Sequence, residues 1–272
     1  MSNCLNCNAA LSTTQKFCSE CGQKTALKRV NLHDVLHDAI HYFTHADKGI
    51  FTLLKSLVLQ PGLVAKEYVE GKRKKHFPPL NFFLIVAAVY LVIGGITSKY
   101  SSSALQRSTQ VNSYKSTPRI TIPDNTQQAQ AEGIKRIEKL AKIGRFFSKY
   151  SNYVAMLAAP LISFLIWLLY LKGRYNFTEH LVANLYLIGF TNLFRCLIFA
   201  PIALLFSIPT ENRNLQFGFM LFEVLYRTLF YYRFMGEYNL AGKAKAFLVA
   251  AGTAIFWSTL IAAIFYFYIL WG

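Results

Sequence analysis

The sequence predicts an all-α membrane protein with about five transmembrane helices, a small amino-terminal zinc ribbon and amphipathic helices at the membrane interface. Hydrophobic residues make up 54% of the 272 residues and charged residues only 15%, which is too apolar for an ordinary soluble domain of this size. The run LNFFLIVAAVYLVIGGI, from Leu80 to Ile96, has no charged residue and is long enough to cross a bilayer as a helix. Two CxxC pairs precede it near the start of the chain.

Residues 1–24 are predicted to fold as the zinc ribbon. Cys4 and Cys7 form one CxxC pair, and Cys18 and Cys21, followed by Gly22, form the other. Two such pairs separated by a short spacer are typical of two turns that present four thiolates to one Zn²⁺. Because cysteine fills all four positions, the metal would be structural and not catalytic. Two disulfides or a redox pair are the alternative, but chelation fits a reducing cytosol better and no secretory signal precedes the motif.

A stripe of histidines follows in residues 25–79, which we expect to form amphipathic helices in the cytoplasm or at the interface. The stripe has a spacing of four residues, so its members share one side of a helix: His33, His37, His41 and His45. An i,i+4 histidine pair can chelate a metal. A polar helix face is the favoured interpretation, because no HExxH motif accompanies the stripe, and a pH-sensitive surface is a third option.

Two shorter amphipathic segments lead to the first span. Residues 49–60 place apolar side chains on one side, but Pro61 and Gly62 end the segment too early for it to span, so it is expected to lie in the interface. Residues 64–71 form another short helix. A basic cluster then marks the cytoplasmic end of the span and is predicted to face lipid headgroups: Lys72, Arg73, Lys74 and Lys75.

The order of these parts resembles a bacterial family of multi-pass inner-membrane proteins that is catalogued only as a domain of unknown function. The matching residues are Pro61, Gly62, Glu67, Tyr68, Gly71, Lys72, Arg73 and Pro78, with Glu179 and His180 further on. The resemblance covers nearly the whole chain and implies no activity. One departure is Asn8, where such ribbons usually have Gly. The five-span plan is also similar in architecture to Yip1-type membrane proteins.

Residues 80–272 are predicted to form the transmembrane bundle. The expected spans are 80–97, 153–171, 181–208, 215–232 and 246–271, with an external loop and a basic amphipathic helix between residues 98 and 150. Five crossings place the termini on opposite sides. The thiols of the ribbon favour a cytoplasmic amino terminus in a bacterial inner membrane, although the basic residues of the long external loop run against the positive-inside rule.

Polar residues within these spans are the remaining candidates for a site. They are His180, Asn184, Thr191 and Arg195, near one face of the third span, and Glu223 and Arg227 on the fourth. Glu179, just before the third span, is a further candidate. Charges at membrane depth usually pair inside the bundle, so Glu223 is expected to meet Arg195, Arg227 or both. A functional site and a structural clamp remain equal alternatives. Cys196 is expected to pack as a small apolar residue.

The predicted function is that of a membrane scaffold or adaptor, which presents the ribbon to a cytosolic partner or an anionic lipid surface. A transporter or channel using Arg195, Glu223 and Arg227 is the alternative, and an intramembrane metal hydrolase is third. No catalytic residue and no cofactor besides Zn²⁺ is predicted. The formal net charge is +16, but the basic residues lie beside apolar runs, which favours membrane lipid and a protein partner over nucleic acid. A homo-oligomer is compatible with this pattern.

Overall fold

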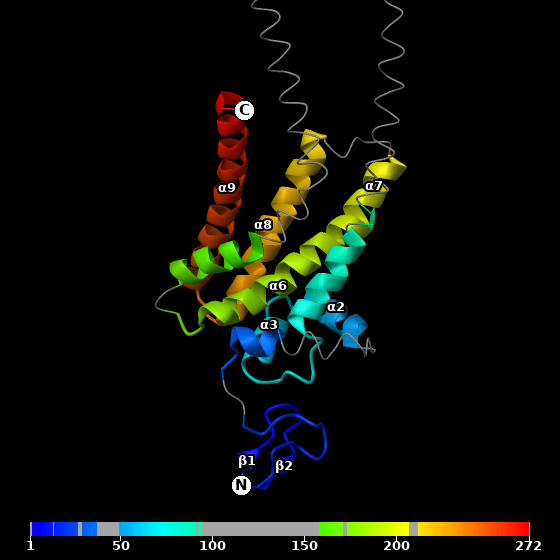
Figure 1. Ribbon diagram of the computed structural model, residues 1–272, viewed down its shortest axis with the longest axis vertical. Helices are drawn as coiled ribbons and strands as arrows, with labels where there is room; N and C mark the ends of the chain where they lie inside the picture. The colour runs from blue at the N-terminus through cyan, green and yellow to red at the C-terminus, as the bar shows by residue number, and fades with distance from the viewer. Residues whose placement is uncertain are drawn as a thin grey trace, which may run out of the picture. The chain divides into compact units, whose positions relative to one another are not determined.

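The chain forms two short strands and then a series of helices (Figure 1). The structure is a computed structural model. It describes residues 2–12, 14–26, 29–36, 49–90, 92–93, 158–170, 173–206 and 212–271. The strands are β1 (Ser2–Asn3) and β2 (Ala10–Leu11), paired antiparallel with Ser2 opposite Leu11. The helices are α2 (Gly49–Leu59), α3 (Leu63–Val69), Pro79–Tyr90, Ala158–Leu169, α6 (Phe177–Phe194), the π-helical turn η1 (Arg195–Phe199), α7 (Ala200–Leu205), α8 (Arg213–Met235) and α9 (Leu240–Trp271). The described protein is therefore mostly helical.

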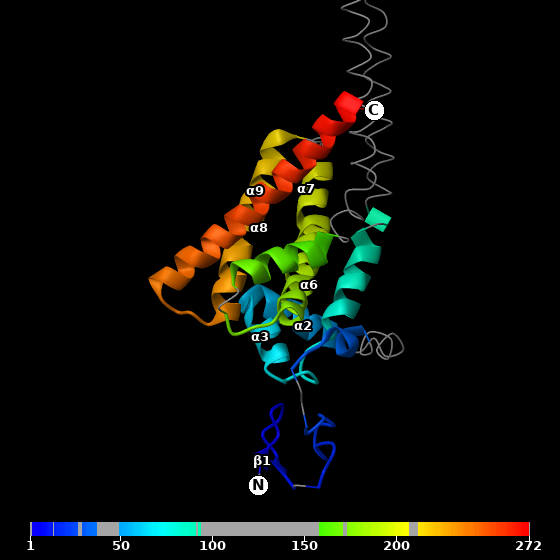
Figure 2. The ribbon, with the colours of Figure 1, turned by 60° about the vertical axis from the view of Figure 1, so that its left-hand side comes forward.

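The turn between α2 and α3 packs directly on the backbone of α8. Gly62 has φ 82°, and a Cβ atom on it would lie 2.0 Å from the carbonyl oxygen of Phe230. Glycine is the residue that allows both the left-handed backbone and this close approach. The turn therefore ends α2 where the sequence predicts and fixes α3 against α8. Both views show α3 beside the start of α6 and the last turns of α8 (Figure 2).

Aromatic side chains fill the core between α3, α6 and α8. Tyr68 of α3 meets Tyr186 of α6 edge to face, with ring centroids 6.1 Å apart. The Tyr186 hydroxyl donates a 2.5 Å hydrogen bond to the carbonyl of Phe77. Phe82 packs against Gly189, where a Cβ atom would approach its ring to 2.7 Å. Burial of such large rings supplies much of the packing energy of the bundle.

The helix that begins with α6 changes its winding before Pro201. The backbone N–H of Ala200 bonds to the carbonyl of Arg195, five residues back, which defines the π-helical turn. Proline has no N–H and its ring crowds the carbonyl four residues earlier, so a widened turn lets the helix continue through α7. The sequence predicted a span with Pro201 inside it, and the structure shows how the helix accommodates that proline.

Two described helices are long and apolar enough to cross a membrane, Phe177–Ala203 and Leu240–Leu260. The expected number of five spans is not supported. Pro79–Tyr90 and Ala158–Leu169 are shorter, and the rest of the predicted spans 80–97 and 153–171 lies largely outside the described residues. Helix α8 is long but more polar, because it includes Arg213, Glu223, Arg227 and Arg233. The expected loop and amphipathic helix of residues 98–150 also lie outside the described residues.

The chain divides into two compact units. The first comprises Met1–Val89 with Leu157–Ala254, and the second comprises Tyr90–Met156 with Ile255–Gly272. The first unit contains both the cysteine motifs and the aromatic core. In the second, the described end of α9 leaves Ile255, Tyr266 and Phe267 more than 60% exposed.

Candidate functional site

The two CxxC motifs fold into two turns of the same shape. The N–H of Asn8 donates to the Cys4 carbonyl and the N–H of Gly22 donates to the Cys18 carbonyl, each at 2.9 Å. Asn8 and Gly22 have φ angles of 66° and 68°, both in the left-handed region. Asparagine tolerates this region better than most residues, so Asn8 can adopt in the first turn the left-handed backbone that Gly22 adopts in the second.

These turns bring the four cysteine sulfurs together. The Sγ atoms of Cys4, Cys7, Cys18 and Cys21 all lie within 4.8 Å of one another. Cys4 and Cys21 are 3.6 Å apart, as are Cys7 and Cys18. A tetrahedral ion with metal–sulfur bonds of about 2.3 Å holds its sulfurs about 3.8 Å apart. All four thiols are free in the structure, so the cluster could hold a metal ion.

The surroundings of the cluster favour thiolate at Cys4. The backbone N–H of Cys7 lowers the pKa of the Cys4 thiol to about 6, against the opposing effect of burial. Leu11 packs with Cys4 and Cys18 to form the small core of the ribbon. Leu5 and Phe17 remain 56% and 58% exposed, so neither covers the cluster.

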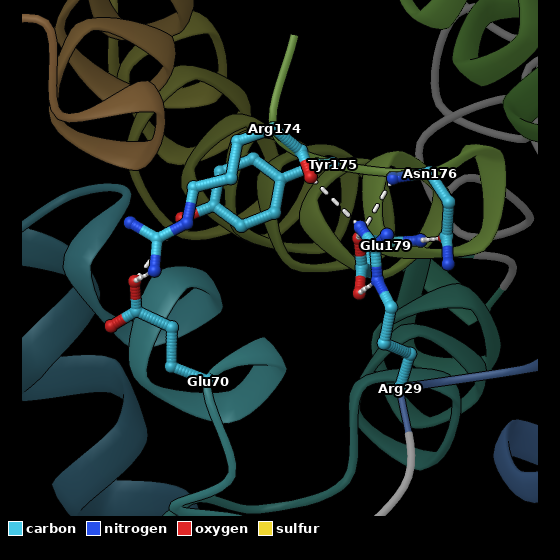
Figure 3. A network of polar contacts seen from close by, with 6 residues as sticks. All are labelled: Arg29, Glu70, Arg174, Tyr175, Asn176 and Glu179. Carbon is cyan, nitrogen blue, oxygen red and sulfur yellow. Dashed lines mark hydrogen bonds and ion pairs between the residues drawn. The ribbon is translucent and has the colours of Figure 1, made fainter.

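A polar junction ties the segment after the ribbon to the start of α6. The Arg29 guanidinium donates from Nε and Nη2 to the two carboxylate oxygens of Glu179, at 3.1 and 2.7 Å (Figure 3). It also donates to the Arg174 carbonyl at 2.8 Å. Glu179 completes a capping box with Asn176, because each side chain accepts from the backbone N–H of the other. One buried carboxylate therefore caps α6 and binds the linker of the ribbon.

The same junction joins the end of α3 to the loop before α6. Glu70 accepts a hydrogen bond from the Tyr175 hydroxyl at 3.3 Å and pairs with Arg174 at 3.4 Å (Figure 3). Burial raises the pKa of Tyr175 and the nearby Glu70 charge raises it further, so the phenol stays a hydrogen-bond donor. Three segments far apart in the sequence thus meet through these contacts.

Glu67 is the centre of a second group of charges in the junction. It accepts from Lys72 Nζ at 2.8 Å, from Lys75 Nζ at 2.7 Å and contacts His76 Nε2 at 2.7 Å. Partial burial acts to raise the pKa of Glu67, but the three hydrogen bonds outweigh it and lower the pKa to about 2. Gly71, with φ 114°, provides the turn that directs the chain back toward Glu67.

The predicted lipid-facing basic cluster therefore makes contacts within the protein. Lys72 and Lys75 bind Glu67, and Arg73, whose side chain is 15% exposed, pairs with Asp34 at 3.9 Å. The backbone N–H of Lys74 donates to the side-chain oxygen of Gln23, which links this loop to the ribbon. The expectation missed these contacts because Asp34 and Gln23 lie well before the cluster in sequence, and Glu67 is reached only through the turn at Gly71.

His180 is buried in a box of aromatic rings. Its ring stacks on Tyr170 and Tyr231, with centroids 5.8 and 6.1 Å away, and meets Tyr175 and Phe234 at larger angles. Neither ring nitrogen has a hydrogen-bond partner among the described residues. The imidazole is thus packed as an aromatic ring, which favours the structural alternative for this residue.

The other polar residues of α6 bind close neighbours. Asn184 donates to Ser163 on the helix Ala158–Leu169 at 2.9 Å, and the Thr191 hydroxyl donates to the Ile188 carbonyl at 3.2 Å. Cys196 is buried, as expected of a small apolar residue. Of the histidine stripe, His33 is exposed, whereas His37, His41 and His45 lie outside the described residues.

Of the two partners expected for Glu223, the structure shows Arg227 and not Arg195. Glu223 and Arg227 form an ion pair of 2.8 Å one turn apart on α8. Arg195 instead contacts Gln216 at 3.4 Å and lies 4.9 Å from the centroid of the Phe219 ring. In the part of the chain that is described, the two arginines therefore do not share Glu223. Rotation around the helix axis decides which side chains meet, and the order of residues along the chain does not specify it between two helices.

Sequence reasoning did not single out several residues of the junction, namely Arg29, Glu70, His76, Arg174, Tyr175 and Asn176. One part of the junction has a local sequence motif that predicts it. Asn176 and Glu179 have the spacing of a capping box immediately before an apolar helix. The partners in the other segments have no such local signal, because their contacts depend on tertiary packing.

The comparisons with known proteins cover a limited part of the chain. The profile of a family described as "Protein of unknown function (DUF3667)" matches residues 47–91. This segment contains α2, α3, the Glu67 group and the helix Pro79–Tyr90. No curated protein and no solved structure matches significantly.

Proposed function

We propose that this protein is a multi-pass membrane adaptor whose ribbon binds Zn²⁺ and is presented to a cytosolic protein partner or an anionic lipid surface. The arrangement we propose has five crossings, with the ribbon in the cytoplasm, in a bacterial inner membrane. It would resemble the family of unknown function along most of its length and Yip1-type proteins in architecture only.

The observation that carries this proposal is the position of the apolar side chains on the ribbon. Leu5 and Phe17 are exposed although the module has a very small core. Exposed large apolar side chains on a fixed, metal-bound turn are suited to contact with a partner surface. The ribbon is also held to the helical core, because Gln23 accepts from the Lys74 backbone and Arg29 binds Glu179.

Support for membrane insertion comes from Phe177–Ala203 and Leu240–Leu260, the two described helices of sufficient length and apolar character. Transport has less support. Glu223 is neutralised by Arg227 on its own helix, and His180 is enclosed by aromatic rings. These contacts leave the polar residues of α6 and α8 engaged with the protein.

The test is site-specific photo-crosslinking in native membranes. A photoreactive residue at Phe17 should capture a discrete protein or anionic lipid, and the capture should fall when Cys7→Ser disrupts the ribbon. The same probe at Phe217, which is 60% exposed on α8, is the matched control for an exposed phenylalanine outside the ribbon. Equal capture at both positions, or capture at Phe17 that is indifferent to Cys7→Ser, would refute the adaptor proposal.

Topology is tested separately with accessible tags. A tag inserted between Ser101 and Asn125 should be labelled from outside the cell, and a tag at the exposed Glu237 only after permeabilisation. Release of the protein from membranes by alkaline carbonate would contradict insertion altogether.

A further inference from the structure

An open depression lies where the end of α2 meets the end of α8. It encloses about 340 Å³ and is lined by Leu59, Gln60, Leu63, Arg233 and Tyr238. This volume lies at the lower end of the range of small-molecule sites in proteins. The depression is separate from the cysteine cluster and from the polar junction, so neither of those sites explains it.

The fold holds the walls of this depression in place. The Gly62 turn brings the end of α2 onto α8, where Arg233 Nη1 donates to the Leu59 carbonyl at 3.2 Å. After α8 ends, Gly236 turns the chain with φ 72° so that Tyr238 forms another wall. The Tyr238 ring contacts Tyr232 at 5.6 Å between centroids. Arg233 is thus fixed by one hydrogen bond and keeps further donors for a ligand.

Two cations beside the depression differ from the cations of the junction. Arg29, Lys72, Lys75 and Arg174 each pair with a carboxylate. Arg233 and Lys66, by contrast, have no carboxylate within ion-pair distance among the described residues.

Lys66 belongs to the same site as Arg233. Its Nζ lies 5.8 Å from the centroid of the Tyr238 ring, which lines the depression. The adjacent acid, Glu237, forms no ion pair with either cation in the described ranges. Positive charge at this place is therefore available to an anion from outside the chain.

The depression has an apolar rim. Leu59 and Tyr238 line it and are more than 60% exposed, as are Val58 and Leu240, their near neighbours in sequence. A cationic hollow bordered by exposed apolar side chains matches the boundary between lipid headgroups and acyl chains, where tyrosine is enriched. A free anion would need the charge but not this rim.

We propose that the depression binds the phosphate of an anionic phospholipid, with Arg233 as the main donor and Lys66 as a second cation. The acyl chains would lie against the exposed residues at the end of α2 and around Tyr238. Guanidinium groups bind phosphate with charge-assisted hydrogen bonds. This inference rests on the membrane insertion proposed above, but not on the ribbon or its partner.

The test measures lipid binding by the full-length protein in a zwitterionic detergent. Short-chain phosphatidylglycerol is titrated and binding is followed by native mass spectrometry, with phosphatidylcholine as the neutral lipid. Arg233→Gln should weaken phosphatidylglycerol binding about tenfold, the loss expected for one charge-assisted hydrogen bond. The matched control is Arg213→Gln, which removes an exposed arginine from the other end of α8 and should leave binding unchanged.

A second variant keeps the test decisive if Arg233→Gln fails to fold. Gln60→Trp fills the depression at an exposed position without changing charge, and it should weaken binding to a similar extent. Unchanged affinity in Gln60→Trp, or equal loss in Arg213→Gln, would overturn the proposal. Competition by inorganic phosphate as strong as that by phosphatidylglycerol would also overturn it, since the site would then recognise a free anion.

Failure of the wider function gives a different result. If the Phe17 crosslinks are absent while Arg233→Gln still weakens lipid binding, the adaptor role fails and the lipid site stands. If the crosslinks are present and phosphatidylglycerol binds both Arg233→Gln and wild type equally, only the lipid site fails.

Discussion

Arg29 and Glu179 are 150 residues apart in sequence and are joined by two hydrogen bonds, of 3.1 and 2.7 Å. The Glu179 side chain is 3% exposed, whereas that of Arg29 is 63% exposed. The buried carboxylate also accepts a hydrogen bond from the backbone N–H of Asn176 in the capping box, which does not involve the arginine. Arg29 can therefore be removed to test how the linker is held, without removing the cap of α6.

We predict that Arg29→Ala loosens the linker without affecting the metal. Backbone amides of residues 29–31 should exchange with deuterium about fivefold faster, because one partly exposed ion pair contributes roughly 1 kcal/mol. Hydrogen-exchange mass spectrometry in detergent makes the measurement. Lys24→Ala, which removes an exposed cation within the ribbon, is the control and should leave those amides unchanged. Equal exchange in wild type and Arg29→Ala would show that the contact does not hold the linker.

The cysteine cluster predicts one zinc ion per chain. Elemental analysis of the purified protein should find about one zinc, and Cys7→Ser should remove most of it, because a four-thiolate site loses a ligand. Cys196→Ala removes a thiol that is buried in η1 and should retain the metal. Zinc content that is the same in Cys7→Ser and wild type would exclude the proposed ligand set.

The sequence was most informative where the chemistry is local. The spacing of Cys4, Cys7, Cys18 and Cys21 predicted a cluster that the structure brings within 4.8 Å. It also predicted the end of α2 at Pro61 and Gly62, because both residues interrupt helices.

Contacts between distant segments could not be predicted in this way. Helical periodicity places Arg195 near the depth of Glu223 but does not specify that it turns toward Gln216. Likewise, nothing in the local pattern connects Glu67 with the two lysines and the histidine that follow it by five to nine residues. Such pairs depend on how the loop after α3 folds back, which tertiary packing decides.

The Glu67 group predicts a loss of stability in acid. In the folded protein the pKa of the Glu67 carboxyl is about 2, below the ordinary value of 4.5. Between pH 2 and pH 4.5 the folded state therefore binds fewer protons than the unfolded state. The stabilisation is complete above pH 4.5 and is lost as the pH falls toward 2. Burial also lowers the pKa of His76, which extends the decline upward toward pH 6.5. Thermal unfolding in detergent between pH 7 and pH 3 measures this decline.

Glu67→Gln is the matched variant for this prediction. It should lower the unfolding temperature at pH 7 and reduce the fall between pH 4.5 and pH 3, because the amide does not titrate. A pH dependence identical to that of wild type would assign the acid lability to other carboxylates.

Gly62→Ala should be strongly destabilising. The new Cβ would meet the Phe230 carbonyl at 2.0 Å in a backbone with φ 82°, so the α2–α3 turn would have to leave α8. We expect a loss of roughly 3 kcal/mol or more in the free energy of unfolding. Gly218→Ala is the control, because a Cβ at that position on α8 meets nothing within 4 Å. It should be neutral or stabilising by about 0.5–1 kcal/mol, and equal effects of the two changes would contradict the packing of this turn.

Glu223→Gln should destabilise the bundle by leaving Arg227 without its ion-pair partner. The Arg227 side chain is 7% exposed, its Nη2 donates to Glu223 at 2.8 Å, and its Nη1 already has no partner among the described residues. Loss of one member of a fully buried pair costs roughly 3–5 kcal/mol, but the Glu223 side chain is 35% exposed, so about 1–3 kcal/mol is expected here.

Replacing Arg227 with Met as well should recover part of this loss, since no charge is then stranded. Arg195→Gln, whose hydrogen bond to Gln216 is 3.4 Å long, should change stability much less. Thermal unfolding of Glu223→Gln, Arg227→Met, the double variant and Arg195→Gln in one detergent decides the matter. If Glu223→Gln unfolds with wild type, or if the double variant is as unstable as the sum of its two single changes, the pair does not stabilise α8.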